Sequence, residues 1–130
     1  MSGTTIFHNP ACSTSRKVLD ALRASGEEPV VVEYLKTPPD RATLRRLAAE
    51  MGLPLRAILR QKAEPYAELG LDDARWSDDE LLDAIERHPV LIERPIVVTP
   101  LGTRLCRPAE KLAEILPPQQ QQQQQQQPSA

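Results

Sequence analysis

A cysteine placed between a strand and a helix constrains this chain more than any other feature. Residues 4–8 read as a buried strand with an apolar centre at Ile6 and Phe7, and residues 15–24 repeat apolar side chains at helical spacing. An Asn-Pro turn at residues 9–10 separates them, and Cys12 follows where the helix is expected to begin. The first N–H groups of a helix have no intrahelical partner and the helix dipole is positive there. Both effects favour a thiolate, so Cys12 is a candidate nucleophile.

The next segment completes a βαβ unit. Ser25 and Gly26 end the first helix, with Gly26 as its left-handed cap. Residues 29–34 (PVVVEY) are β-branched and apolar, which predicts a central strand of a sheet. A strand, a helix and a strand joined by short links predict parallel pairing with a right-handed crossover.

An all-helical insertion is expected between Asp40 and His88. The pattern predicts a helix over Arg41–Met51 that begins at Asp40 or Pro39 and is capped by Gly52. It also predicts a helical turn over residues 55–59, an irregular stretch or one short helix over residues 65–71, and a helix ending near Arg87 that starts with a Ser77–Glu80 capping box.

Strands resume after the insertion. Residues 96–99 (IVVT) and 103–107 flank a Pro-Leu-Gly turn and predict an antiparallel hairpin, and residues 109–116 predict a last helix behind Pro108. The order predicts an α/β domain of the thioredoxin-like plan, a four-stranded mixed sheet flanked by helices. We assign residues 1–117 to this domain, and residues 118–130, mostly glutamine, to a disordered poly-Gln tail.

The composition excludes several classes of function. The net charge of −2 and the aromatic content of 3% give no support to a nucleic-acid partner. We expect no membrane span and no signal peptide, because no apolar run is long enough and the N-terminus lacks a charged and apolar leader. Two cysteines are too few for a disulfide framework and too far apart for a local zinc site. We therefore expect no metal and a reducing cytoplasm.

The residues around Cys12 have two interpretations each. Cys12 could be a small buried hydrophobe, but its place at a helix start favours the nucleophile. Ser15 stands where a C-x-x-C oxidoreductase keeps its second cysteine, so a thiol from elsewhere must resolve an intermediate on Cys12. Ser13 and Thr14 are either helix caps or donors of backbone N–H groups to a bound anion. His8 either tunes the thiol or hydrogen-bonds the backbone.

Arginines from other segments are the candidates for holding an anion. Cysteine phosphatases wrap their anion with a C-x5-R loop, but Val18 occupies that arginine's position here. Arg94 precedes Pro95 and is therefore extended, and a cis bond there would place it beside the Cys12 loop, although cis is the minority state. Arg60 ends a helical turn in the insertion. A solvated surface side chain is the alternative for each.

Arg107 ends the predicted hairpin. In a regular strand Cys106 and Arg107 point to opposite faces. An Arg107 that faces Cys12 therefore turns Cys106 away, which argues against a disulfide between the two cysteines.

Five stretches of the chain carry a resemblance to a known family: HNPACSTSR, EYLKTPPDRATL, RAILRQKAEPY, HPVLIERPIVVTPLGTRLCRP and EILP. Over residues 4–117 the chain resembles the ArsC-type arsenate reductases, which work with glutathione and glutaredoxin. The chain has Ser13 where the family usually has glycine, and its glutamine tract replaces the family's C-terminal extension.

The resemblance implies a cytoplasmic enzyme of arsenic detoxification that reduces arsenate to arsenite. It makes Cys12 the nucleophile and His8 its activating neighbour, and it implies a cis peptide at Arg94-Pro95. It makes Arg60, Arg94 and Arg107 an oxyanion clamp. Glutathione is the implied co-substrate and glutaredoxin the implied partner, with no metal, flavin, nucleotide or other tightly bound cofactor.

Two alternatives remain on the same fold. One is a regulator resembling Spx, which binds RNA polymerase; such regulators commonly carry C-x-x-C and lack the arginines. The other is a glutathione-dependent thiol reductase with another substrate. Ser15 and the three retained arginines favour arsenate.

Overall fold

The computed structural model describes residues 3–116 of the chain. These residues form two compact units, described separately below. Of the described residues, unit 1 contains 3–33 and 94–116, and unit 2 contains Tyr34–Glu93. The predicted glutamine tail lies outside the described residues, so it and the proposed domain boundaries stay predictions.

Unit 1 is built on a four-stranded mixed sheet, as predicted. Its strand order is β2-β1-β3-β4, with β2 parallel to β1 and the other two neighbouring pairs antiparallel. Residue Thr99 pairs with Gly102, which leaves a two-residue hairpin turn between β3 and β4. The strands are β1 (Thr5–His8), β2 (Val30–Glu33), β3 (Ile96–Thr99) and β4 (Gly102–Leu105).

The predicted central position of the second strand is wrong, because β2 lies at the edge of the sheet. Its first residue, Val30, is 63% exposed. A run of β-branched residues fits any pleated surface and does not specify whether the strand has one neighbour or two.

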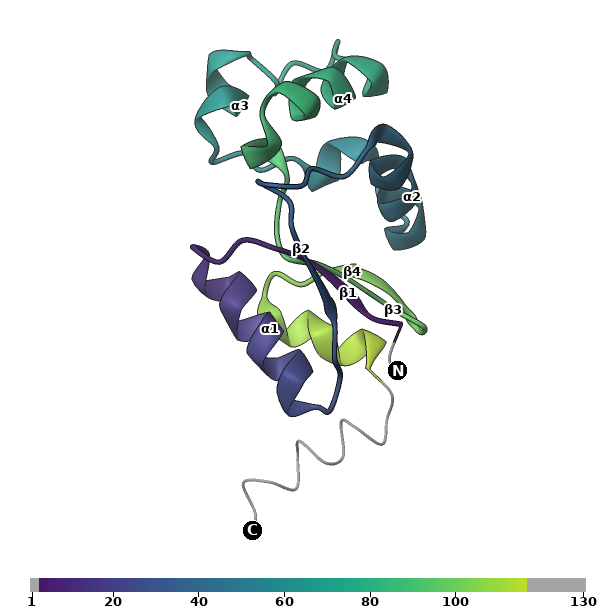
Figure 1. The fold of residues 1–130 in the computed structure, drawn as a ribbon. Helices are drawn as coiled ribbons and strands as arrows, with labels where there is room; N and C mark the ends of the chain where they lie inside the picture. Colours follow the sequence, from purple (N-terminus) through teal and green to yellow (C-terminus); the bar gives the residue numbers. More distant parts are fainter. Residues whose placement is uncertain (1–2, 117–130) are drawn as a thin grey trace. The chain divides into compact units, whose positions relative to one another are not determined.

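Two helices of unit 1 cover one face of this sheet (Figure 1). Helix α1 (Ser13–Ala24) begins two residues earlier than predicted, because Cys12 is already the extended N-cap residue. The N–H groups of Gly26 and Glu27 bond back to Arg23 and Leu22, and Gly26 has φ +94°. The predicted last helix is η3 (Ala109–Ile115), and it is a 3₁₀ helix.

The core of unit 1 lies between these helices and the sheet. Helices α1 and η3 are in contact with each other. The sheet contributes Ile6 and Val97, and Cys106 is completely buried beside them. The helices contribute Val18, Leu19, Leu22, Leu112 and Ile115, and Leu116 follows η3 directly.

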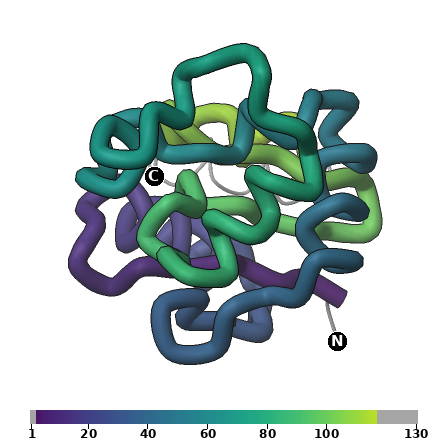
Figure 2. The backbone as a smooth tube through the Cα atoms, turned by 90° about the horizontal axis from the view of Figure 1, so that it is seen from above, coloured from purple at the N-terminus to yellow at the C-terminus, as the bar shows by residue number. Residues whose placement is uncertain are grey.

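Unit 2 is the predicted helical insertion. Figure 2 shows it as the blue to green run of short helices and turns. An isolated bridge joins Leu59 to Ile92 near its end. The helices are α2 (Arg41–Met51), η1 (Leu55–Ile58), α3 (Glu64–Glu68), α4 (Asp78–Arg87) and η2 (Pro89–Leu91). Among residues 3–116, every helix is too short or too polar to span a bilayer.

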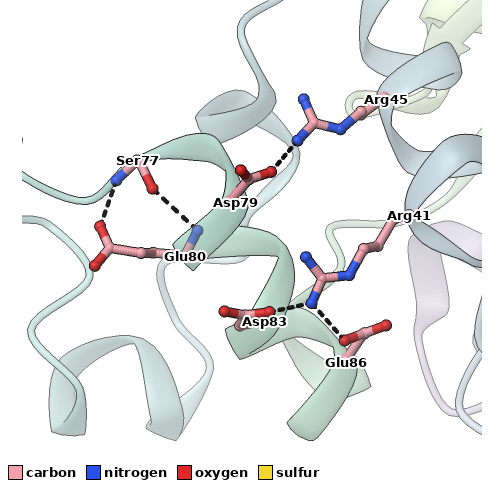
Figure 3. A network of polar contacts seen from close by, with 7 residues as sticks. All are labelled: Arg41, Arg45, Ser77, Asp79, Glu80, Asp83 and Glu86. Carbon is pink, nitrogen blue, oxygen red and sulfur yellow. Dashed lines mark hydrogen bonds and ion pairs between the residues drawn. The ribbon is translucent and has the colours of Figure 1, made fainter.

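Capping and ion pairs organise α2 and α4 (Figure 3). The Ser77 hydroxyl accepts from the Glu80 N–H at 3.2 Å, and the Glu80 carboxylate accepts from the Ser77 N–H at 2.8 Å. This is the predicted capping box. Exposed ion pairs link the two helices and add little to stability. They join Arg41 to Asp83 and Glu86, and Arg45 to Asp79.

Candidate active site

The loop between β1 and α1 holds Cys12 in a fixed position. The Asn9 side chain accepts from the Ala11 N–H at 2.9 Å, and the Asn9 carbonyl accepts from the Cys12 N–H at 3.0 Å. Arg16 donates to the Pro10 carbonyl at 2.9 Å. These bonds place the half-exposed Cys12 at the start of α1. Asn9 was not among the predicted site residues, although an Asn before a Pro is a known signal for such a side-chain turn.

The surroundings of Cys12 favour its thiolate. Burial alone raises the pKa of this thiol. The Ser15 backbone N–H and hydrogen bonds from the Arg94 and Arg107 side chains outweigh that effect and lower the pKa from 9.0 to about 7. The Arg107 Nη1 lies 3.7 Å from the Cys12 sulfur. A large share of Cys12 is therefore ionised at neutral pH, as a nucleophile requires.

Backbone pairing brings the two arginines together. Arg94 and Pro95 are joined by a cis peptide immediately before β3, in agreement with the resemblance. The Cys106 N–H donates to the Pro95 carbonyl at 2.9 Å, and the Arg107 side chain donates to the Arg94 carbonyl at 3.2 Å. Two guanidinium groups from separate segments thus meet at one sulfur, an arrangement that suits a bound oxyanion.

His8 contacts Ser15. The His8 Nδ1 lies 2.6 Å from the Ser15 hydroxyl, which also accepts from the Asn9 N–H at 3.1 Å. Burial lowers the pKa of His8 despite the opposing charge of Glu33, so the ring is neutral at pH 7. The ring thus contacts Ser15, whose own N–H donates to Cys12, and its lowered pKa disfavours the charged form. Its role as an activating neighbour stays a prediction.

The second cysteine is removed from this chemistry. Cys106 is 0% exposed, and its sulfur lies 3.8 Å from the Arg104 carbonyl. Burial raises its pKa to about 12, with Glu114 adding to the effect. As expected, the Arg107 side chain meets Cys12 while Cys106 packs into the core of unit 1. A disulfide between Cys12 and Cys106 has no support in this geometry.

The remaining predicted residues are placed as follows. Arg60 belongs to unit 2, where its guanidinium donates to Glu93 at 3.0 Å and its N–H donates to the Leu91 carbonyl at 2.7 Å. Ser13 and Thr14 lie in the first turn of α1, where backbone N–H groups lack intrahelical partners. The roles of Arg60, Ser13 and Thr14 in binding an anion stay predictions. Within residues 3–116, no group of three His, Cys, Asp or Glu side chains could hold a metal ion.

A family model described as "ArsC family" matches residues 7–115. The chain belongs to the ArsC family. A protein named "Arsenate reductase" from Rhizobium meliloti is 59% identical over 113 residues, which cover 87% of this chain and 81% of the relative. One of the same name from Escherichia coli K12 is 58% identical over 117 residues, which cover 90% and 83%.

A solved structure supports the family's fold for this chain. The structure named "Arsenate reductase from Vibrio cholerae" superposes with a TM-score of 0.83 at 47% identity, covering 87% of this chain and 97% of that one. The thioredoxin-like fold expected from the order of strands and helices is thereby confirmed.

For this ArsC-family protein we expect the alkylation rate of Cys12 by iodoacetamide to rise with pH through a midpoint of about 7. The rate follows the thiolate fraction, which is small below the pKa and large above it. In Arg107→Ala the midpoint moves upward, toward 9.0, because one of the hydrogen bonds that lower the pKa is lost. Mass spectrometry of the labelled protein provides the measurement.

Arg104→Ala is the matched control for this titration. Arg104 is on β4, three residues before Arg107, and pairs with Glu114 at 2.9 Å. The control keeps the wild-type midpoint. A wild-type midpoint near that of a free cysteine would contradict the assignment of Cys12 as a stabilised thiolate.

Proposed function

We propose that this protein is an oxidoreductase that reduces arsenate to arsenite. The observation that supports it most is the meeting of Arg94 and Arg107 at the Cys12 sulfur, whose pKa is lowered to about 7. Membership of the ArsC family and relatives named arsenate reductases at 58% and 59% identity agree with this chemistry. A role in arsenical resistance follows from the same proposal.

In the proposed complex the tetrahedral anion binds beside Cys12. The guanidinium groups of Arg94 and Arg107 each offer paired N–H donors to its oxygens. Arg60 is the proposed third arginine, and the N–H groups of Ser13 and Thr14 are the proposed backbone donors. The charge that develops on the oxygens during attack is stabilised by these fixed donors.

The reaction balances with two thiols from outside the chain. The Cys12 thiolate attacks arsenic and displaces one arsenate oxygen as water. A first external thiol then bonds to arsenic and displaces a second oxygen as water, with protons taken up from solvent. A second external thiol attacks the sulfur of the first, and the As–S bond breaks with its electron pair left on arsenic, so that arsenic gains two electrons and the two thiols become one disulfide. Hydrolysis then releases arsenite and returns Cys12 as a thiolate.

We propose glutathione as the first of these thiols and glutaredoxin as the second. External thiols are needed because Ser15 replaces a resolving cysteine and Cys106 is buried. No tightly bound cofactor takes part in this scheme. Its dependence on reduced thiols supports a reducing cytoplasm as the proposed compartment.

The regulator alternative is disfavoured by the residue at position 15. A redox switch of the C-x-x-C kind needs a second thiol there, whereas the Ser15 hydroxyl is engaged with His8 and Asn9. The other alternative, a thiol reductase with a different substrate, would form no arsenite in the assay described next.

The test measures arsenite formation by the purified protein with arsenate, glutathione and glutaredoxin, leaving out each component in turn. We expect arsenite only when arsenate and a thiol donor are both present, and faster formation with glutaredoxin. Absence of arsenite with every donor would contradict the proposed function.

A further inference from the structure

A cavity of about 330 Å³ in unit 1 borders the Cys12 site. Its walls come from α1 and from the segment after β4, and Arg107 is one of its lining residues. The same Arg107 contacts the Cys12 sulfur at 3.7 Å. The same arginine side chain therefore borders both the reactive sulfur and the cavity. The lining residues are Thr14, Lys17, Arg107, Pro108, Ala109 and Glu110.

The charges in this cavity are mixed and open to a ligand. Lys17 and Arg107 are positive and Glu110 is negative. Both Lys17 and Glu110 are exposed. In the part of the chain covered by the structure, neither of them forms an ion pair with another side chain. A ligand with one carboxylate and one ammonium group would satisfy both.

We infer that this cavity binds the proposed small thiol co-substrate by a zwitterionic end that carries one carboxylate and one ammonium group. Its carboxylate pairs with Lys17 and Arg107, and its ammonium group pairs with Glu110. The inference rests on the proposed function, which needs an external thiol because Ser15 and the buried Cys106 cannot resolve Cys12. Neither Lys17 nor Glu110 was among the residues predicted from the sequence.

The size of the cavity limits the ligand. Pockets for small molecules span about 300–1,000 Å³, so a volume of about 330 Å³ suits a thiol of tripeptide size or smaller. Glu110 repels an arsenate dianion from this cavity, whereas Arg94 and Arg107 at the sulfur attract it. The two substrates are thereby directed to adjacent positions with Arg107 between them.

Charge reversal tests the assignment. We compare Lys17→Glu and Glu110→Lys with the wild-type protein in arsenate reduction driven by glutathione or by 2-mercaptoethanol, which carries no charge. We expect the ratio of the KM for glutathione to the KM for 2-mercaptoethanol to rise about fivefold to tenfold in each variant, because an attraction of surface-pair size becomes a repulsion. Lys111→Glu keeps the wild-type ratio, since Lys111 is exposed on η3 but does not line the cavity.

Thiols with a single charge identify which end of the ligand each residue meets. Glu110→Lys should raise the KM for cysteamine, whose charge is an ammonium, and lower the KM for mercaptoacetate, whose charge is a carboxylate. Lys17→Glu should raise the KM for mercaptoacetate. These opposite changes are a readout that a general loss of folding would not give.

The outcomes separate this inference from the proposed function. If the wild-type protein forms no arsenite with any thiol, the proposed function fails. If it forms arsenite but the variants keep wild-type KM ratios, the thiol site is overturned and arsenate reduction stands. If the variants change the KM for glutaredoxin but keep the wild-type ratio of the KM values for glutathione and 2-mercaptoethanol, a site for a small thiol is likewise overturned.

Discussion

Replacing Cys12 by serine should abolish arsenate reduction, with kcat falling by on the order of a thousandfold or more. The serine hydroxyl keeps the shape of the residue but does not ionise near neutral pH, although the Ser15 N–H and the two arginines remain in place. The thiolate is the group that forms the bond to arsenic, so no other residue replaces it. Initial rates of arsenite formation at saturating arsenate and glutathione provide the measurement.

Cys106→Ala is the control for this experiment. Cys106 is buried in the core of unit 1 with its pKa raised to about 12, so its sulfur takes no part in the proposed exchange. We expect this variant to retain most of the activity and to unfold at a slightly lower temperature. An equal loss of activity in both cysteine variants would point instead to an intramolecular disulfide mechanism.

Arg94→Ala should lower kcat/KM for arsenate about tenfold to 150-fold. A hydrogen bond to a charged group contributes roughly 1.5–3 kcal/mol, and each 1.4 kcal/mol corresponds to about a factor of ten. Two effects combine in this variant. The oxyanion loses a donor, and the Cys12 pKa rises because Arg94 lowers it both by hydrogen bonding and by charge.

A pH profile separates the two effects of Arg94→Ala. The part of the loss due to the raised thiol pKa is recovered as the pH increases above that pKa, because the thiolate then forms in both proteins. The part due to the lost donor persists at every pH. Arg104→Ala, whose side chain pairs with Glu114, should match the wild-type protein throughout. An unchanged kcat/KM in Arg94→Ala would exclude Arg94 from the clamp.

Local signals in the sequence were enough to place the two longest helices of unit 2, α2 and α4. The predicted bounds of α2 are those observed, since the Asp40 side chain accepts from the Thr43 N–H at 2.8 Å and Gly52 adopts φ +69°. The capping box at Ser77 likewise fixed the start of α4. Such features act between residues a few positions apart, so the sequence shows them directly.

Features that depend on distant partners could not be predicted in the same way. Strand β2 is at the edge of the sheet because β3 pairs with the opposite side of β1. Strand β3 begins more than sixty residues after β2 ends, so no local signal near β2 shows this pairing. The Ser15 hydroxyl meets His8 while the Ser15 N–H meets Cys12, and the sequence does not show which of these two groups faces the thiolate. Side-chain direction of this kind follows from tertiary packing rather than from residue type.

The burial of Cys106 also affects how this protein withstands oxidants. If peroxide converts Cys12 to a sulfenic acid, the usual rescue is capture by a nearby thiol as a reversible disulfide. The chain has only two cysteines, and the other one is enclosed in the core with a protonated sulfur. Protection of Cys12 from irreversible sulfinic and sulfonic acids therefore depends on thiols supplied by the cell, and a thiol-depleted cell would lose the enzyme permanently rather than store it in an oxidised form.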